Sequence, residues 1–490
     1  MDFEHGADTA RSYITNTLYN EDSVLRYRTE SIEDILNDSR ILSRMIMHHY
    51  NYQVPRLNIL ESYYLSNNAA ILNGKRRNDE KKADYRVRHA FADVISNFLN
   101  SYVLANPVKI DADQDKFIEI VENFNKVNDI DAHNLEIGKD QNNMGRAYEL
   151  IQRTTGDEDK LYRLDPREVF MIYDLSVRTR VIGACRYYRS NNYDPNDQSY
   201  KVELYTHDKI YRYNLANISI EKKLVLESEE NHLFGGVPII EYRSDRHRMA
   251  TYEKVLSQID AYDAGQSDTA NYMTDFNDAI LVIEGMVKNA EDGSLINLMK
   301  DANVLMLIPD NNLDGSSGNA KASYLTKSYD VQGVESYKSR IRQDIFSLSS
   351  TPDLSDESFG GTRSGESLKY KMFGLEQKRS DKEKFLMKGF RIRYKLLENI
   401  KRQVREYSGE PAELNFTFTP NLPKAVMEEL QTFINAGGQI SNETKLAQLS
   451  FVDNVKEEVE KIQQENSPIV DTLDDDWELN HEASKADRLQ

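Results

Sequence analysis

The sequence predicts an α+β fold that is mainly helical. Long stretches of the 490-residue chain place apolar residues at three- and four-residue intervals, which is the spacing of one helix face. The region from about 145 to 244 differs, because short runs rich in Val, Ile and Tyr alternate there with polar turns, as in antiparallel strands. The length exceeds that of one compact core, so we expect about three domains or one elongated subunit with several parts.

The N-terminal part is expected to be mostly helical. From Ala83 to Tyr102 apolar residues fall on one helix face, and Asn106-Pro107 stops the helix. Six strands are expected after it, at 147–153, 169–173, 181–188, 201–205, 209–213 and 238–242.

Two helices are expected to enclose a small insert. The first runs from about 250 to Gly285, and the second covers about 329–350 and ends before Pro352. The insert between them, 286–328, contains the turn sequence PDNNLDGSSGN, which is typical of a Gly-rich hairpin loop. Its expected parts are a short helix, a strand, that turn and a second strand, at 295–299, 304–308, 309–319 and 322–326.

The stretch GGTRSGESLKY, which begins at Gly360, matches a phosphate-binding loop except that Glu366 stands where the lysine is required. A working P-loop also follows a buried strand. The preceding segment, SLSSTPDLSDESF, is polar and acidic and contains a proline. We therefore interpret this stretch as a flexible acidic loop that opens a helix, with Ser364 as its N-cap.

A very long helix is expected from Ser364 to about Tyr407. Its second half carries a near-heptad apolar stripe that Arg393 interrupts, and its middle is polar on all sides, as in helices that bridge solvent or neighbouring subunits. The remaining expected parts are a strand, three short helices and a mobile acidic tail, at 415–421, 423–435, 443–449, 453–464 and 471–490.

Composition argues against several classes of protein. A net charge of -19 argues against gripping nucleic acid by phosphate neutralisation, although a duplex can slide past a repulsive wall. The single cysteine, Cys185, lies in an apolar run and fits a buried thiol in a reducing cytoplasm. The acidic start does not match a signal peptide, and the apolar runs are far shorter than the roughly 18 residues of a membrane span.

Three other groups suggest chemistry but have simpler interpretations. His48 and His49 are adjacent, so on a helix they point about 100° apart and cannot share a zinc ion. The tail cluster DTLDDD lacks the glycine and final glutamate of a calcium loop. Ser364, Ser367 and Lys369 lack the strand-turn-helix frame of a Ser-Lys nucleophile. We therefore predict no catalytic residue, metal site or cofactor.

The order of these parts resembles the portal proteins of tailed double-stranded-DNA bacteriophages, in particular those of siphophages of Gram-positive hosts. The likeness spans nearly the whole chain, and the combination of stretches and their order carry it. These stretches are YYLSNNAAIL (63–72), RVRHAFADVISNFLNSYVLANPV (86–108), DFNDAILVIEG (275–285), SGESLKYKMFGLE (364–376) and NFTFTPNLP (415–423).

The resemblance implies a portal-type subunit with wing, stem, clip and crown regions, about twelve copies of which form a ring around an axial DNA channel. The regions would be wing 1–248, stem helices 249–285 and 329–350, clip 286–328, tunnel loop 351–363, long wing helix 364–414, crown 415–470 and acidic tail 471–490.

The same resemblance implies a non-enzymatic protein of the virion, at the capsid portal vertex, assembled in the cytoplasm of the host bacterium. It would nucleate procapsid assembly and form the channel for DNA packaging and ejection. Its partners would be further copies of itself, double-stranded DNA, the terminase large subunit, a head-completion or adaptor protein, and the scaffolding and major capsid proteins. No membrane and no cofactor are implied.

The implied site residues form three groups. Those of the tunnel loop are Ser355, Asp356, Phe359, Gly360, Gly361 and Arg363. Those of the clip hairpin, expected to dock partners, are Asp310, Asn311, Asn312, Leu313 and Gly315. The basic residues Lys338, Arg340 and Arg342 of the second stem helix would make transient DNA contacts, and the alternative for them is intersubunit salt bridges or solvated charges.

Two other functions stay open on the sequence alone. A nucleotide-dependent enzyme would use the degenerate P-loop at 360–367 and would have to bind ATP or GTP. A head or tail scaffold protein without a channel would lack closed cyclic symmetry around a central hole.

Overall fold

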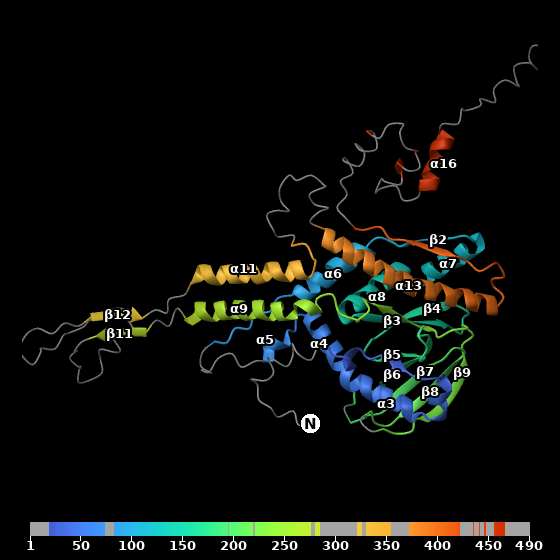
Figure 1. Ribbon diagram of the computed structural model, residues 1–490, viewed down its shortest axis with the longest axis horizontal. Coiled ribbons are helices and arrows are strands. Elements are labelled where there is room, and N and C mark those ends of the chain that lie inside the picture. Colours follow the sequence, from blue (N-terminus) through green and yellow to red (C-terminus); the bar gives the residue numbers. More distant parts are fainter. Residues whose placement is uncertain are drawn as a thin grey trace, which may run out of the picture. The chain divides into compact units, whose positions relative to one another are not determined.

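The computed structural model describes residues 19–73, 83–194, 196–218, 221–275, 280–284, 321–325, 330–353 and 372–421, together with 435, 441, 445–446 and 455–465. The chain divides into two compact units, Met1–Asn421 and Leu422–Gln490. Figure 1 shows the elements of both units in the colours of the sequence.

The first helices of the chain follow one another with little interruption. They are η1 (Asp22–Val24), α2 (Ile32–Asn37), α3 (Arg40–His48), the π-helical turn η2 (His49–Gln53), α4 (Val54–Tyr64) and α5 (Ala69–Asn73). Ser31 begins α2 with a capping box, in which the Asp34 carboxylate accepts from the Ser31 backbone N–H at 3.0 Å. Pro55 has no backbone N–H to donate to the preceding turn, which is where the π-helical turn lies.

Helix α6 (Phe91–Leu104) begins later than the sequence predicts. The expected helix started at Ala83, but residues 83–90 are not helical, and the first helical hydrogen bond runs from Val94 N to Ala90 O. The reason is that the backbone N–H groups of Tyr85 and Val87 donate to side chains of a distant helix instead. The prediction for 83–90 was therefore wrong, and the prediction for 91–102 is confirmed.

Two β-sheets form the body of the first unit. The larger has the strand order β1-β5-β6-β7-β8-β9, and the smaller has the order β10-β3-β4. Their strands are β1 (Tyr27–Arg28), β3 (Arg146–Arg153), β4 (Asp159–Leu164), β5 (Val169–Tyr173), β6 (Val181–Arg189), β7 (Tyr200–Tyr205), β8 (Lys209–Leu215), β9 (Val225–Asn231) and β10 (Ile239–Arg243). All neighbouring strands are antiparallel except β1, which pairs parallel to β5.

The six strands predicted between 147 and 242 are confirmed as β3, β5, β6, β7, β8 and β10. The sequence reading missed β1, β4 and β9. It also missed that the expected strand near 415, β13 (Leu414–Thr417), pairs with β2 (Lys109–Ala112) from a distant part of the chain. The residues of β9 are all exposed, so this strand lacks the buried apolar side chains that mark strands such as β3 and β5.

Helices α7 (Asp115–Val127), α8 (Ile130–Met144) and α13 (Phe373–Gln403) accompany the smaller sheet (Figure 1). Gly389 of α13 lies against the ring of Tyr242 in β10, and a Cβ at Gly389 would stand 2.1 Å from Tyr242 Cε1. Helix α13 ends at Gln403, earlier than the expected Tyr407, because Arg405 takes a left-handed φ of 63° and the N–H of Tyr407 turns back to Lys401 O.

The first of the two helices around the insert is shorter than predicted. It comprises η3 (Glu253–Val255) and α9 (Leu256–Asp275), whereas Ile280–Glu284 forms strand β11. The prediction of a helix at residues 280–284 was therefore wrong. The run ILVIE is rich in β-branched residues and pairs antiparallel with β12 (Lys321–Leu325), the second strand expected of the insert. The expected helix at 295–299 and strand at 304–308 lie outside the described residues.

The second of these helices is confirmed as α11 (Val331–Leu348). In the C-terminal unit, α16 (Val455–Glu465) confirms the third of the predicted short helices.

Candidate functional site

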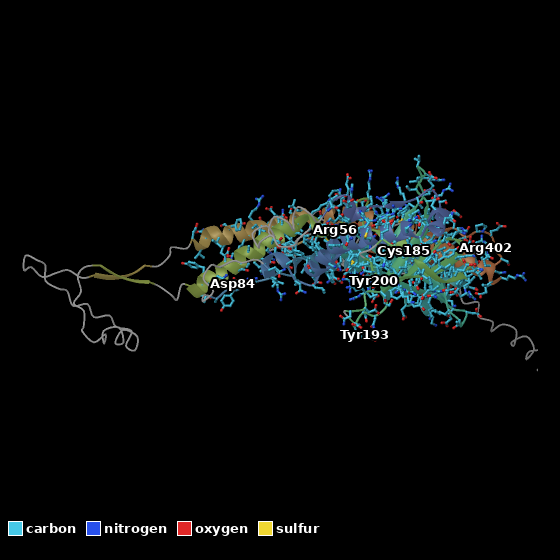
Figure 2. All side chains as sticks on the ribbon, turned by 90° about the horizontal axis from the view of Figure 1, so that it is seen from below. Arg56, Asp84, Cys185, Tyr193, Tyr200 and Arg402 are labelled. Atoms are coloured by element: carbon cyan, nitrogen blue, oxygen red, sulfur yellow. The ribbon has the colours of Figure 1, made fainter. Side chains whose placement is uncertain are left out.

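Helices α9 and α11 lie side by side, one before and one after the hairpin of β11 and β12 in the sequence (Figures 1 and 2). Their ends nearest the sheets share one hydrophobic core with α4 and α6. Its fully or nearly fully buried members are Leu60, Tyr63, Phe91, Ala92, Ile95, Ala250, Tyr252, Val255, Leu256, Ile259, Ile341 and Ile345. This core anchors the helix pair to the body of the first unit.

An extended segment, 83–90, which we call the strap, runs along α9. The strap donates from Tyr85 N to Asn271 Oδ1 at 2.7 Å and from Val87 N to Ser267 Oγ at 2.9 Å. Asn271 Nδ2 also donates to Tyr85 O at 3.3 Å, whereas the single hydroxyl proton of Ser267 has Asp263 O at 2.7 Å and Val87 O at 3.4 Å as acceptors. Figure 2 labels Asp84, near the start of the strap.

A third contact continues the same register. His89 Nδ1 lies 2.8 Å from Asp263 Oδ1, and Asn68 donates to the other oxygen of that carboxylate. Four residues of an α-helix rise about 6 Å, and two residues of an extended chain span about 6.6 Å. The side chains that α9 presents at every fourth residue therefore match alternate residues of the strap. These side chains, Asp263, Ser267 and Asn271, are nearly or fully buried.

Asp260, one turn before, has a perturbed carboxyl group. Burial raises the pKa of Asp260 to about 6, against the lowering effect of the hydrogen bond that the Tyr63 hydroxyl donates at 2.6 Å. The nearby charge of Asp263 raises it further. Protonation of this carboxyl between pH 7 and pH 5 thus occurs next to the strap contacts.

Helix α11 leaves much of its surface uncovered within the chain. Val331, Tyr337 and Leu348 are each more than half exposed, at 53%, 55% and 59%. The polar residues around them, such as Ser336 and Gln343, are exposed as well. Large apolar side chains on the open face of a helix are typical of a surface that makes further contacts outside the chain.

The three basic residues predicted on this helix are each paired with a carboxylate of the same chain. Lys338 is buried and pairs with Glu335, Arg340 is exposed and pairs with Asp344 at 3.2 Å, and Arg342 pairs with Asp353 at 3.0 Å. The Arg342 guanidinium also lies 5.8 Å from the centre of the Phe346 ring.

The other predicted site residues cannot be compared with the structure. The tunnel-loop residues Ser355, Asp356, Phe359, Gly360, Gly361 and Arg363 lie outside the described residues. So do the clip-hairpin residues Asp310, Asn311, Asn312, Leu313 and Gly315.

The histidines and the cysteine have structural surroundings. His48 Nδ1 lies 3.0 Å from the Tyr27 hydroxyl, and His49 Nδ1 lies 2.7 Å from that of Tyr187. Cys185 is fully buried in β6, and burial raises the pKa of its thiol well above the usual value. Within the described ranges, no cluster of three His, Cys, Asp or Glu side chains is placed to hold a metal ion, and no helix is long and apolar enough to cross a membrane.

Sequence reasoning missed a buried network that joins α13 to the smaller sheet. Arg393 forms two hydrogen bonds with Glu149 of β3, whose carboxylate also accepts from the Tyr242 hydroxyl at 2.7 Å and lies 2.9 Å from His133 Nε2. The signal was present, because Arg393 interrupts an otherwise apolar stripe. A charged residue in such a stripe indicates a buried partner of opposite charge.

Lys382, one of the polar residues in the middle of α13, is also buried. Its ammonium donates to Asn100 Oδ1, Gly138 O and Asn142 Oδ1 at 3.1, 3.2 and 2.7 Å. Burial lowers the pKa of Lys382 to about 7. The polar middle of α13, which the sequence indicated as exposed, is thus partly inserted between α6 and α8.

Comparison with known proteins finds relatives that match most of the chain. The family model described as "Phage portal protein, SPP1 Gp6-like" matches residues 43–471. The portal protein of Bacillus phage SPP1 is 23% identical over 409 residues, covering 80% of this chain and 78% of that protein. The portal protein of Clostridium phage phiCD119 is 23% identical over 438 residues, covering 84% of this chain and 92% of that protein.

Among solved structures, a chain described as "Neck of empty GTA particle computed with C6 symmetry" aligns with a TM-score of 0.41 and 13% identity, covering 73% of this chain and 88% of that one. The family match extends over the strap, the helix pair, α13 and every strand of the two sheets except β1. This chain therefore belongs to the SPP1 Gp6-like family of phage portal proteins.

Proposed function

We propose that about twelve copies of this chain form a closed ring at one vertex of a phage capsid, around a channel through which the genome is packaged and later ejected. Family membership over residues 43–471 is the observation that carries this proposal. The ring would also nucleate assembly of the procapsid. The protein would act as a conduit and docking platform, and hydrolysis would belong to the terminase.

The helix pair supports the assignment of regions. We assign α9 and α11 to the stem, 286–328 to the clip, 351–363 to the tunnel loop and 415–470 to the crown. The uncovered apolar side chains Val331, Tyr337 and Leu348 of α11 would meet a neighbouring copy in a ring. That contact would remove from water the apolar surface that the single chain leaves exposed.

The charge distribution is consistent with a channel that does not hold DNA. Each subunit carries a net charge of -19. The cations of α11 are offset by Glu335, Asp344 and Asp353, so they would add little fixed positive charge to the wall of a channel. Transient phosphate contacts by Lys338, Arg340 and Arg342 would then require these ion pairs to open. Such a wall favours sliding of the duplex over binding.

The partners would be those of a portal vertex. We propose that the clip hairpin around Asp310, Asn311, Asn312, Leu313 and Gly315 receives the terminase large subunit and later a head-completion or adaptor protein. Scaffolding and major capsid proteins would contact the ring during assembly in the bacterial host.

The proposal is tested by electron-microscopic class averaging of the purified protein, with native mass spectrometry to count the subunits. A ring of about twelve subunits with an open centre is the expected result. A monomer under all assembly conditions, combined with saturable ATP or GTP binding, would instead favour the nucleotide-dependent enzyme. A closed assembly without a central hole would favour the scaffold protein.

Two variants test the assigned regions. Deletion of Leu313 to Gly318 should leave ring formation intact but impair packaging or head completion, and loss of the ring would contradict the docking role. Cysteines placed at Ser355 and Gly361 and then cross-linked should block DNA passage. Unimpeded packaging after verified cross-linking would contradict the assignment of 351–363 to the channel.

A further inference from the structure

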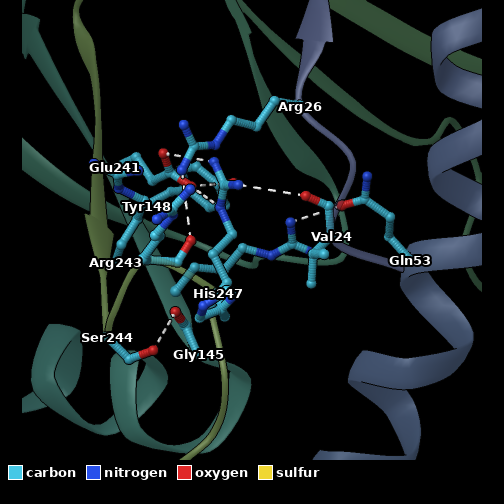
Figure 3. A network of polar contacts seen from close by, with 12 residues as sticks. Val24, Arg26, Gln53, Gly145, Tyr148, Glu241, Arg243, Ser244 and His247 are labelled. Carbon is cyan, nitrogen blue, oxygen red and sulfur yellow. Dashed lines mark hydrogen bonds and ion pairs between the residues drawn. The ribbon is translucent and has the colours of Figure 1, made fainter. Parts of the chain in front are cut away.

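Four arginines interact with one another where the smaller sheet meets the N-terminal segment, and Figure 3 labels two of them, Arg26 and Arg243. Arg146 begins β3, Arg243 ends β10, Arg248 lies in the loop after β10, and Arg26 lies just before β1. We call these four residues the arginine cluster. Arg146 and Arg248 are buried, with 2% and 4% exposure, whereas Arg26 and Arg243 are half-buried.

A single carboxylate is hydrogen-bonded to the arginine cluster. Among the residues that the structure describes, the only carboxylate that hydrogen-bonds to any of the four guanidinium groups is Glu241. Arg248 occupies both of its oxygens, from Nε to Oε1 at 2.6 Å and from Nη2 to Oε2 at 3.1 Å. The Tyr173 hydroxyl donates to Oε2 at 2.6 Å and the Tyr148 hydroxyl to Oε1 at 3.4 Å, so three partners together use the acceptor capacity of Glu241.

Arg146 is therefore left without an anionic partner. Its Nη1 donates to Gln53 Oε1 at 2.7 Å, but Nε and Nη2 are buried without an acceptor. The Tyr148 hydroxyl also lies beside this guanidinium, and it donates to Glu241 Oε1 at 3.4 Å. A guanidinium stays charged even when buried, so an unpaired one in this position is destabilising.

A second buried guanidinium nearby shows the same deficit. Arg56 donates from Nε and Nη2 to Glu253, but its Nη1 is buried without an acceptor. Among the described residues, the arginine cluster and Arg56 together comprise five arginines, and the carboxylates that hydrogen-bond to them are Glu241 and Glu253. The neighbouring positive charges of Arg248 and Arg56 add to the effect of burial in lowering the pKa of Arg146.

We propose that a small inorganic oxyanion, with phosphate as the probe, binds at the arginine cluster and accepts hydrogen bonds from Nε and Nη2 of Arg146. These two N–H groups form the fork that pairs with two oxygens of one oxyanion. Arg26 and Arg243 supply further positive charge on the more exposed side. The two donor atoms are shielded from solvent, which favours a free ion over the phosphodiester of a nucleic acid.

The ion is structural. Arg248 donates to Glu241 and, at 3.5 Å, to Val24 O, so the cluster already joins the segment before β1 to the end of β10 (Figure 3). Neutralising the excess positive charge strengthens that junction, in which Arg26, Arg146 and Arg248 otherwise repel one another.

Thermal unfolding of the full-length protein in inorganic phosphate tests the proposal, with sodium chloride at the same ionic strength as the reference. The expected result is a saturable rise in Tm of about 2 °C in phosphate beyond that in chloride. Isothermal titration with phosphate gives the stoichiometry, expected to be one per subunit. An equal rise in Tm in phosphate and in chloride would show that the salts act only by screening charges, and it would overturn the proposal.

Variants locate the site. Arg146→Met should abolish the phosphate-specific rise, and Arg26→Gln, at a half-buried position, should weaken phosphate binding about tenfold. Arg40→Gln, an exposed arginine of α3, is the matched control and should leave it unchanged. An unchanged phosphate response in Arg26→Gln and Arg146→Met would overturn the assignment. An equal rise with a DNA duplex at the same phosphate concentration would overturn the preference for a small ion.

Discussion

Arg393 of α13 and Glu149 of β3 are joined by two hydrogen bonds, Nε to Oε1 at 2.9 Å and Nη2 to Oε2 at 2.6 Å, and both side chains are 0% exposed. The pair connects the long helix to the smaller sheet at the centre of the first unit. Burial alone would raise the pKa of Glu149, but Arg393 and His133 hold it at about 2.

Arg393→Met should destabilise the subunit by about 3–5 kcal/mol, because it removes the guanidinium from a buried carboxylate that keeps only Tyr242 and His133 as partners. The double variant Arg393→Met with Glu149→Leu should recover part of this loss. Urea unfolding of the two variants and the wild type measures both values. A single variant as stable as the wild type would show that the pair contributes little.

The same pair predicts an acid limit. The pKa of Glu149 in the folded protein lies below its usual value of 4.5, so its contribution is present above about pH 4.5 and is lost as pH falls toward 2. The dependence of Tm on pH in this range should therefore be flatter in the double variant than in the wild type.

Lys382→Met should stabilise the protein in a pH-dependent way. The pKa of Lys382 is lowered from 10.5 to about 7, so the folded state binds fewer protons than the unfolded state between these values. This residue then costs the wild type up to roughly 1.4 kcal/mol for each pH unit below 10.5, until about pH 7. The Tm difference between variant and wild type should grow from pH 9.5 to pH 7.5. A difference independent of pH would mean that the lysine is hydrated in solution.

Gly389→Ala should destabilise the contact of α13 with β10. The added Cβ would stand 2.1 Å from Tyr242 Cε1, and the ring is fully buried with its hydroxyl fixed on Glu149. The expected cost is about 1–3 kcal/mol. The adjacent exposed substitution Lys388→Ala is the control, and unfolding of both variants in urea gives the comparison.

Ser267→Ala combined with Asn271→Ala should release the strap from α9. Each substitution removes an acceptor from a backbone N–H and is expected to cost about 1 kcal/mol. Hydrogen exchange at the amides of Tyr85 and Val87 should accelerate, while exchange in α6 should not. Ser257→Ala, at the exposed start of α9, is the control and should leave the exchange rates of the Tyr85 and Val87 amides unchanged. Protected strap amides in the double variant would show that the strap is held by other contacts.

Local patterns predicted most of the elements, and long-range pairing explains most of the errors. The strands β3, β5, β6, β7, β8 and β10 follow runs of Val, Ile and Tyr, and α11 follows its apolar spacing. The strap has helical spacing at Val87 and Phe91, yet it is extended because Ser267 and Asn271, about 180 residues later, take its backbone N–H groups. Strand β11 was assigned to a helix because its partner β12 lies 37 residues further along the chain at Lys321.

The candidate site was only partly predictable for a similar reason. The sequence identified the positions of Lys338, Arg340 and Arg342 on one helix but not their partners Glu335, Asp344 and Asp353. Two of these lie within one helical turn, where an ion pair is foreseeable. Arg146 and Lys382 gave no signal, because a basic residue in a strand or in a polar helix looks the same whether it is exposed or buried.

The strap determines the rotational setting of α9. Its three contacts, at Asp263, Ser267 and Asn271, follow one line along the helix, and a rotation of α9 by one residue, about 100°, would break all three together. The three strap contacts therefore oppose rotation of α9 about its own axis, whereas a push or a pull can still be transmitted along that axis.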